Sequence, residues 1–173
     1  ANTRHLCAGR DRVGEKTLYY TQVQTGVVFC TELKPILIHY IDKPQINPQA
    51  LAECIRYNYP LDLTNTWIEQ IKRLKPGTYA LVDDKGMEIH RYWQREVRPL
   101  FRGSIVDAQN ETIRLLRESV EQCLQSDVPV GILLSGGVDS SLISALAVET
   151  GKEIHAITAG YKGEHQCDER ETA

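Results

Sequence analysis

The residues best suited to chemistry form one short run of glycines, hydroxyls and a carboxylate, namely Ser135, Gly136, Gly137, Val138, Asp139, Ser140 and Ser141. Glycine lets backbone amides approach a ligand without a Cβ in the way. The first amides of a helix have no intrahelical partners and lie at the positive end of its dipole, so such a turn binds anions, phosphate in particular. A carboxylate would repel phosphate unless a cation intervened, and we therefore expect Asp139 to bind Mg²⁺ together with phosphate oxygens.

This chemistry requires a strand before the run and a helix after it. Residues 128–134 are a continuous apolar stretch, typical of a parallel strand that is covered on both faces. Residues 140–150 predict a helix that ends before Gly151, and residues 153–159 predict a second strand. Together they form a βαβ unit. A serine- and glycine-rich connection capped by Ser140 is the alternative, but the flanking strand and helix favour a phosphate loop.

The two common nucleotide-binding loops do not occur in this sequence. A Walker loop needs Gly-Lys followed by Ser or Thr, but Gly151 and Lys152 precede Glu153. The Gly-x-Gly-x-x-Gly dinucleotide pattern is also absent. The run at 135–141 therefore belongs to another kind of phosphate site.

The part of the chain before this unit predicts short strands, turns and helices. The predicted strands are residues 4–8, 17–22, 27–31, 78–82 and 89–93, the last two joined by a hairpin turn at 83–86. Predicted helices are residues 49–57, started by Asn47-Pro48, residues 66–74, stopped by Pro76-Gly77, and residues 108–125. The charged stretch 95–98 indicates a linker between two parts.

Composition indicates an ordinary globular protein of one or two small domains. Of the 173 residues, 42% are hydrophobic and 25% charged, and the net charge of -3 gives no bulk attraction to nucleic acid or anionic membranes. No apolar run approaches the roughly 18 residues of a membrane span. The five cysteines include no C-x-x-C pair, so we expect reduced, mostly buried thiols in a cytoplasmic protein.

Other charged and metal-ligating residues favour ordinary roles. The charges of Arg10, Asp11 and Arg12 are interpreted as a solvated turn. His165 and Cys167 have the spacing of a ligand pair, but no second pair accompanies them, so we expect no structural metal site.

The run at 135–141 resembles the Ser-Gly-Gly-x-Asp-Ser signature of the PP-loop ATP pyrophosphatases. Residues 127–134 narrow the resemblance to the glutamine-hydrolysing asparagine synthetase family. Residues 9–20 look like that family's Arg-Asp-x-x-Gly-x-x-Pro-Leu-Tyr-Tyr hairpin, with Thr17 in place of the usual proline. Further similar stretches are Glu32-Leu33-Lys34, Leu74-Lys75-Pro76-Gly77-Thr78-Tyr79 and Arg91-Tyr92-Trp93.

The resemblance implies an α/β and α+β architecture in two domains. Residues 1–95 would be the C-terminal half of a type 2 glutamine amidotransferase domain, antiparallel, β-rich and of N-terminal-nucleophile fold. Residues 96–107 would be a linker. Residues 108–173 would be the N-terminal part of a PP-loop ATP pyrophosphatase domain, with the first βαβ unit of a parallel sheet.

The resemblance also implies a reaction, in which ATP adenylates the aspartate side-chain carboxylate and ammonia from glutamine displaces AMP to give asparagine. On the matching positions, pyrophosphate and magnesium would be held by Ser135, Gly136, Gly137, Asp139, Ser140 and Ser141. Adenine would lie against Leu133 or Leu134 and against Ala159, for which ordinary strand core is an equal alternative. The implied cofactors are ATP and Mg²⁺, and the implied partners are small-molecule substrates rather than nucleic acid or membrane.

The sequence departs from the family at the glutaminase nucleophile. That nucleophile is an N-terminal cysteine, whereas this chain begins with Ala1, and Cys7 has no free α-amino group beside it. We therefore assign no catalytic residue, and we expect an internal fragment that alone hydrolyses no glutamine and makes no asparagine.

Two other functions remain open at this stage. A β-lactam synthetase-like enzyme or another amidotransferase of the superfamily would keep the loop and change the acceptor. A non-catalytic module would use the loop to bind phosphate or nothing. The sequence leaves oligomeric state open, a homodimer included.

Overall fold

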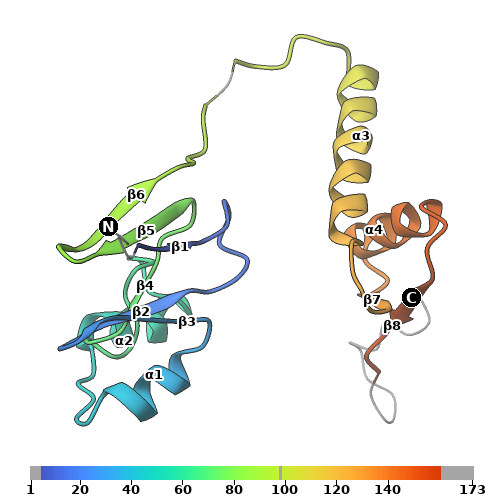
Figure 1. Ribbon diagram of the computed structural model, residues 1–173. Helices are drawn as coiled ribbons and strands as arrows, with labels where there is room; N and C mark the ends of the chain where they lie inside the picture. The colour runs from blue at the N-terminus through green and yellow to red at the C-terminus, as the bar shows by residue number, and fades with distance from the viewer. Residues whose placement is uncertain (1–4, 98, 161–173) are drawn as a thin grey trace. The chain divides into compact units, whose positions relative to one another are not determined.

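The computed structural model describes residues 5–97 and 99–160, and the chain divides into two compact units, residues 1–97 and 98–173. In the described ranges, the first unit holds two antiparallel sheets and two helices, and the second holds two helices and a parallel strand pair (Figure 1). The mixed α/β architecture with antiparallel strands and a parallel pair agrees with the prediction at this level. None of the helices in the described ranges has the length and apolarity needed to cross a lipid bilayer.

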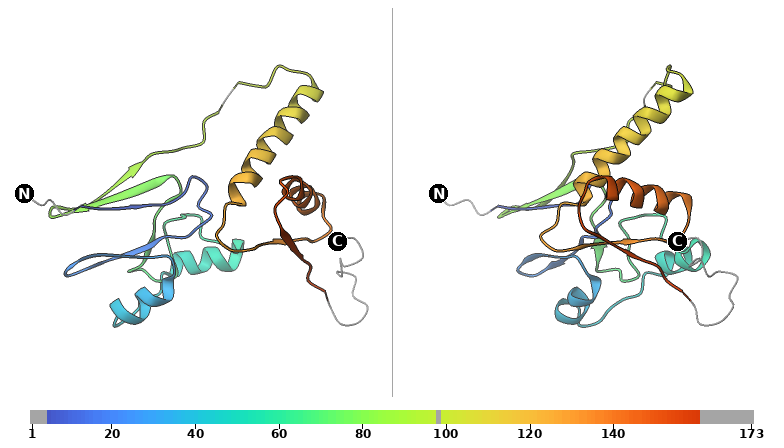
Figure 2. Two further views of the ribbon diagram at one scale, coloured as in Figure 1. Left: turned by 45° about the vertical axis from the view of Figure 1, so that its right-hand side comes forward. Right: turned by 90° about the vertical axis from the view of Figure 1, so that its right-hand side faces the viewer.

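The first unit contains two three-stranded sheets, which Figure 2 shows from two further directions. One has the order β1-β5-β6 and the other the order β3-β2-β4. The strands are β1 (Leu6–Gly9), β2 (Tyr19–Val23), β3 (Gly26–Cys30), β4 (Lys72–Arg73), β5 (Thr78–Asp83) and β6 (Gly86–Arg91). The five predicted strands and the 83–86 turn are confirmed, although β6 begins three residues earlier than predicted because its hairpin is tight.

Two helices complete this unit, α1 (Leu33–Tyr40) and α2 (Pro48–Tyr57). The predicted start of α2 is confirmed, since the Asn47 side chain accepts a 3.1 Å hydrogen bond from the Ala50 amide. Helix α1 was not predicted. The fully buried apolar residues of the unit come from both helices, from β5 and from the segment before it, namely Ile36, Ala50, Ile71, Leu74 and Ala80.

The prediction of a helix over residues 66–74 is wrong. The segment has irregular structure followed by the short strand β4, with an isolated bridge between Ile46 and Ile68. The buried Thr66 hydroxyl donates to the Ile71 carbonyl at 2.8 Å and accepts from the Ile68 amide at 3.1 Å. A threonine side chain that bonds nearby backbone groups competes with helix formation, which explains why the apolar spacing was misleading.

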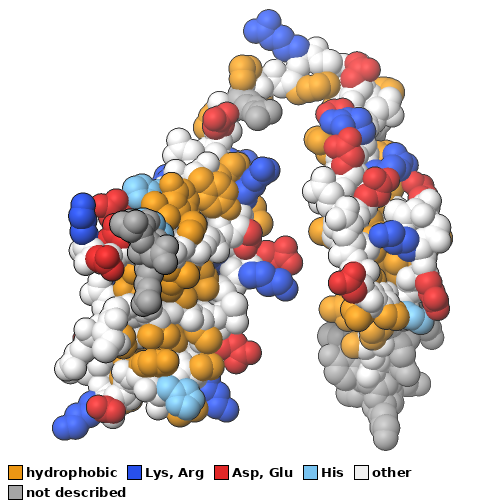
Figure 3. Space-filling model, in the orientation of Figure 1, with side chains coloured by type: hydrophobic (Ala, Val, Ile, Leu, Met, Phe, Trp, Pro, Cys, Tyr) orange, Lys and Arg blue, Asp and Glu red, His pale blue; other side chains and the backbone are white. Residues whose placement is uncertain are grey.

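The second unit contains α3 (Ile105–Cys123), β7 (Val130–Leu133), α4 (Val138–Glu149) and β8 (Ile154–Ile157). Strands β7 and β8 are parallel and paired from Val130 and Ile154 onward, which confirms the predicted βαβ unit. Helix α3 begins three residues before the predicted start because Ser104 and Asp107 form a capping box. Acidic and basic side chains both lie along α3 (Figure 3), where Arg114 pairs with Glu111 and Glu118.

The core of the second unit lies between its two helices and one face of the strand pair. Its buried members are Val120, Leu124, Leu146 and Ala147, with Leu116, Val130, Ile132 and Ile154 packed against them. The other face is open, since 77% of Leu133 and 54% of Ile157 are exposed. Within the described residues, the prediction of a strand covered on both faces is therefore wrong.

The cysteine prediction is also wrong in one respect. All four cysteines of the described ranges are free thiols, but Cys7 and Cys123 are exposed and Cys30 and Cys54 only partly buried. Cys167, like His165, lies outside the described residues.

Candidate functional site

The loop between β7 and α4 has the backbone that an anion site requires. Gly136 has a φ of 71°, a left-handed conformation that favours glycine. Gly137 is the N-cap of α4 and, lacking a side chain, leaves the helix end uncapped. Its carbonyl accepts the Ser141 amide at 3.0 Å, which closes the first helical turn. The loop thus turns sharply from strand to helix and presents a bare helix N-terminus.

Five consecutive amides of this loop face no acceptor in the part of the chain that the structure describes. Among the described residues, no carbonyl or side chain accepts a hydrogen bond from the N–H groups of Gly136, Gly137, Val138, Asp139 or Ser140. Three of them belong to the first turn of α4, where intrahelical partners are absent by geometry. Several unpaired donors at the positive end of a helix dipole form a cradle for a negatively charged group.

The hydroxyl of Ser140 forms its hydrogen bonds within the loop. Ser140 Oγ lies 3.0 Å from Ser135 Oγ, accepts the Ser135 amide at 3.3 Å, and donates to the Gly137 carbonyl at 3.1 Å. A hydroxyl has one donor and two acceptor positions, so these three contacts use the full capacity of Ser140. In this arrangement Ser140 braces the loop with its side chain, and its amide remains available. Ser141 is exposed at the same helix end.

Asp139 lies in the first turn of α4 with its side chain exposed. No hydrogen bond or ion pair within the described ranges engages its carboxylate. No cluster of three or more histidine, cysteine or acidic side chains forms a metal cage in those ranges. A carboxylate that no described residue engages, beside a bare helix N-terminus, would suit Mg²⁺, which is usually bound by one or two carboxylates together with substrate phosphates and water.

The three residues predicted to face adenine lie near the carboxyl ends of β7 and β8. Leu133 pairs with Ile157, and both side chains belong to the open face of the strand pair. Leu134 is partly buried, its amide donating to the Ile157 carbonyl at 2.9 Å, and Ala159 is exposed. Ligands of open parallel sheets bind outside these carboxyl ends, where an exposed apolar pair can cover a flat base. The strand-core alternative does not describe Leu133, which is not buried among the described residues.

The interpretation of the Arg10 region as a solvated turn is wrong for Arg10 itself. Only 8% of Arg10 is exposed, and its guanidinium donates to the carbonyls of Gly14, Lys16 and Leu74 at 2.7–2.8 Å. Burial lowers the pKa of Arg10, and the nearby Arg73 acts in the same direction. Arg10 organises the loop that follows it, a role that sequence reasoning missed because the Leu74 carbonyl is remote in the chain.

Asp11 completes this loop by accepting hydrogen bonds from four backbone amides. Its carboxylate oxygens lie 2.6–3.2 Å from the amides of residues 13–16. These bonds, that of Glu15 first, lower the pKa of Asp11. Gly14 at the centre has a φ of 75°, and a Cβ there would lie 2.7 Å from Pro76 Cγ. The loop is a locked structural element rather than a flexible surface turn.

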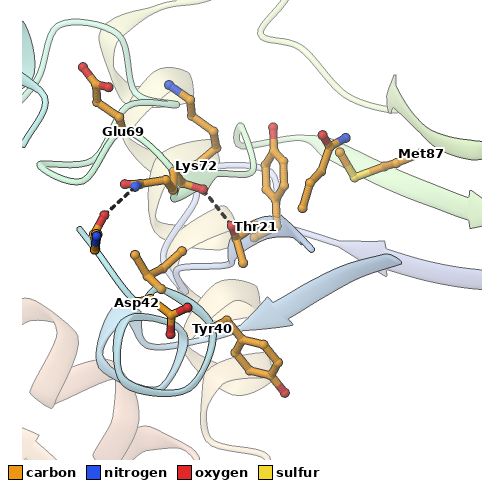
Figure 4. Close-up of a pocket in the computed structure, with 11 residues that line it drawn as sticks. Thr21, Tyr40, Asp42, Glu69, Lys72 and Met87 are labelled. Carbon is orange, nitrogen blue, oxygen red and sulfur yellow. Dashed lines mark hydrogen bonds between the residues drawn. The ribbon is translucent and has the colours of Figure 1, made fainter. Parts of the chain in front are cut away.

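A cleft of about 610 Å³ lies elsewhere in the first unit, among β2, the end of α1 and the segment before β4 (Figure 4). Its charged lining is mixed, with Asp42 and Glu69 opposed by Lys43 and Lys72. The polar groups of Gln70 are already bonded to the Gln45 amide and the Lys43 carbonyl. Sequence reasoning did not predict this cleft, and its internal hydrogen bonds indicate a role in holding neighbouring loops together.

Comparison with known proteins places the two units in two families. Residues 1–93 match the model of the glutamine amidotransferase domain, and residues 111–173 match that of asparagine synthase. "Asparagine synthetase [glutamine-hydrolyzing] 3" of Bacillus subtilis is 35% identical over 143 residues, covering 82% of this chain and 23% of that protein. The "Amidase chry2" of Gibberella zeae is 33% identical over 150 residues, 84% of this chain and 22% of that protein. "Asparagine synthetase [glutamine-hydrolyzing] 1" of Bacillus subtilis is 28% identical over 169 residues, 93% and 25% respectively.

The glutamine amidotransferase match precedes the asparagine synthase match along the chain, and this order defines the class of two-unit protein that this chain represents. The chain belongs to the glutamine-hydrolysing asparagine synthetase family. It spans about a quarter of the length of the relatives described above.

Proposed function

We propose that this chain forms part of a glutamine-dependent asparagine synthetase and that its β7–α4 loop binds the pyrophosphate of MgATP. The observation that carries the proposal is the row of five amides, from Gly136 to Ser140, that find no acceptor among residues 5–97 and 99–160, next to the Asp139 carboxylate, which no group in those ranges engages. Splitting ATP between its α and β phosphates leaves a strongly anionic leaving group. A cradle of fixed donors stabilises that charge as it develops, because the dipoles need no reorganisation.

Each residue of the loop has a distinct part in this proposal. The amides of Gly136, Gly137 and Ser140 donate to the phosphate oxygens, and the hydroxyl of Ser141 adds a donor at the rim. The Ser135 hydroxyl supports the loop by donating to Ser140 Oγ. Asp139 holds Mg²⁺, which neutralises phosphate charge when bound. Leu133, Leu134 and Ala159 provide the apolar side of the nucleotide site. One helix end contributes only about 0.3–2 kcal/mol, so several donors and the metal must act together.

The domain assignment belongs to the same proposal. Residues 1–95 are proposed to be the C-terminal half of a type 2 glutamine amidotransferase domain of N-terminal-nucleophile fold. Residues 96–107 are proposed to be the linker, and residues 108–173 to begin a PP-loop ATP pyrophosphatase domain. The proposed substrates are the small molecules ATP, aspartate and glutamine, with aspartate adenylated before ammonia displaces AMP.

Titration calorimetry with inorganic pyrophosphate and Mg²⁺ tests the loop directly. We expect binding by the chain that disappears on chelation of the metal and weakens about tenfold or more in Asp139→Asn, since one metal ligand is lost. The matched control is Asp127→Asn, which removes an exposed carboxylate at the amino end of β7 and leaves the loop intact. Equal affinity of the two variants, or no binding by the parent chain, would reject the proposal.

A second candidate keeps the loop and changes the acceptor of the amide nitrogen. The fungal relatives named amidases, at 33% and 31% identity over most of this chain, favour it. ATP–pyrophosphate exchange by the protein that contains this chain separates the two. Exchange that depends on aspartate supports the synthetase, whereas exchange that depends only on another carboxylate supports the second candidate.

A further inference from the structure

Thr158 holds the strand end from which the phosphate loop starts. It directly follows β8, and its Oγ1 donates a 2.9 Å hydrogen bond to the Leu134 carbonyl. Leu134 directly follows β7, and its amide donates to the Ile157 carbonyl at 2.9 Å. Both backbone polar groups of Leu134 are therefore held from β8. The bond of the Leu134 amide continues the parallel ladder, whereas the Leu134 carbonyl is bonded to a side chain in place of a backbone amide.

The peptide group between Leu134 and Ser135 is restrained at both of its polar atoms. Its carbonyl oxygen accepts from Thr158 Oγ1, and its N–H donates to Ser140 Oγ at 3.3 Å. A peptide group is planar, so two hydrogen bonds at opposite ends define the orientation of the whole unit. The bonds come from two different elements, the end of β8 and the first turn of α4.

The orientation of this peptide group sets the direction of the next amides. Gly136 follows at once, and two soft dihedrals per residue are all that separate the restrained plane from the Gly136 and Gly137 N–H groups. A glycine pair has more conformational freedom than any other, so without an anchor before it the cradle would sample many arrangements. Preorganised donors bind an anion more tightly than donors that must first be ordered.

We propose that Thr158 is a positioning residue of the pyrophosphate site, acting through the Leu134–Ser135 peptide group and never touching the ligand. The proposal rests on the phosphate-binding function proposed above. The hydroxyls of Thr158 and Ser140 together form a clamp on this peptide group, and the amide of Ser140 remains a ligand-binding group.

Thr158→Val removes the hydroxyl while keeping the β-branched shape. We expect its affinity for Mg²⁺-pyrophosphate to fall about fivefold, as the loss of one net hydrogen bond permits. Thr158→Ser keeps the hydroxyl and should restore most of the affinity. The matched control is Thr112→Val, which removes a 2.8 Å bond from a threonine hydroxyl to the Ala108 carbonyl within α3. If Thr158 had a purely structural role, its variants would shift the thermal midpoint of unfolding, but their pyrophosphate affinity would not depend on whether the hydroxyl is present.

Two results would overturn the inference while leaving the proposed function standing. The first is pyrophosphate binding by Thr158→Val within twofold of the parent chain. The second needs no variant and no ligand, and is measured by ¹⁵N relaxation of the parent. We expect an order parameter near 0.85 at Ser135, and a value below about 0.6 would show that no clamp exists. If the parent chain binds no pyrophosphate, the proposed function fails instead, and the positioning role falls with it.

Discussion

Arg10→Met removes the guanidinium that organises the first unit while keeping an unbranched apolar stem. Three carbonyls, those of Gly14, Lys16 and Leu74, lose their donor in a site where Arg10 is only 8% exposed. Hydrogen bonds to a charged group contribute about 1.5–3 kcal/mol each. The lost bonds are partly offset because burial of the guanidinium is itself costly, as its lowered pKa indicates, and because repulsion from Arg73 is relieved.

We therefore expect Arg10→Met to lower the free energy of unfolding by about 3–5 kcal/mol, a large share of the roughly 5–15 kcal/mol of a typical domain. Urea denaturation followed by tryptophan fluorescence suits the measurement, because both tryptophans, Trp67 and Trp93, belong to the first unit. With a slope of about 1–3 kcal/mol per molar urea, the midpoint should move by at least about 1 M.

The control for this prediction is Arg12→Met, which alters an exposed arginine two residues away. Its midpoint should stay close to that of the parent, since substitutions at the surface usually change stability by less than about 0.5 kcal/mol. If both variants unfold at the same urea concentration, the hydrogen bonds of Arg10 do not stabilise the fold and the reasoning fails.

Three further predictions concern local structure. Gly14→Ala should lower the free energy of unfolding by about 1–3 kcal/mol, because a side chain there is strained at a φ of 75° and its Cβ would lie 2.7 Å from Pro76 Cγ. The control is Gly151→Ala, which has a similar φ of 73° but open space around it, and it should lower stability less. Thermal melts followed by circular dichroism measure both. Asp11 has a lowered folded-state pKa, so its stabilisation is complete above its unfolded pKa of about 3.9 and is lost as pH falls through the folded pKa. Urea midpoints should then fall less steeply in acid for Asp11→Asn than for the parent, and parallel profiles would contradict this. Ser104→Ala breaks the capping box of α3 and should cost about 1 kcal/mol, measured by thermal melts against Ser126→Ala; an unchanged midpoint would show that the cap does not stabilise α3.

Local chemistry was enough to predict most elements of this chain. The helix start at Asn47, the hairpin turn at 83–86 and the βαβ unit around 135–141 each depend on residues only a few positions apart. A cap, a tight turn or a bare helix end is determined by backbone geometry within one or two turns, and so the turn between β7 and α4 could be located from residue types alone.

The tertiary structure decided how distant residues meet. Arg10 is buried and hydrogen-bonded within the first unit because the fold brings the Leu74 carbonyl, 64 residues away in sequence, next to its guanidinium. Thr158, which directly follows β8, donates to the Leu134 carbonyl 24 residues earlier, and no spacing rule relates the two. Residues 66–74 carry a helical pattern, yet Ile71 and Leu74 are buried without a helix because the two residues between them, Lys72 and Arg73, pair with β2. Such outcomes depend on which segments pack together. The free energy of packing between segments that are distant in sequence cannot be inferred from a local pattern of residues.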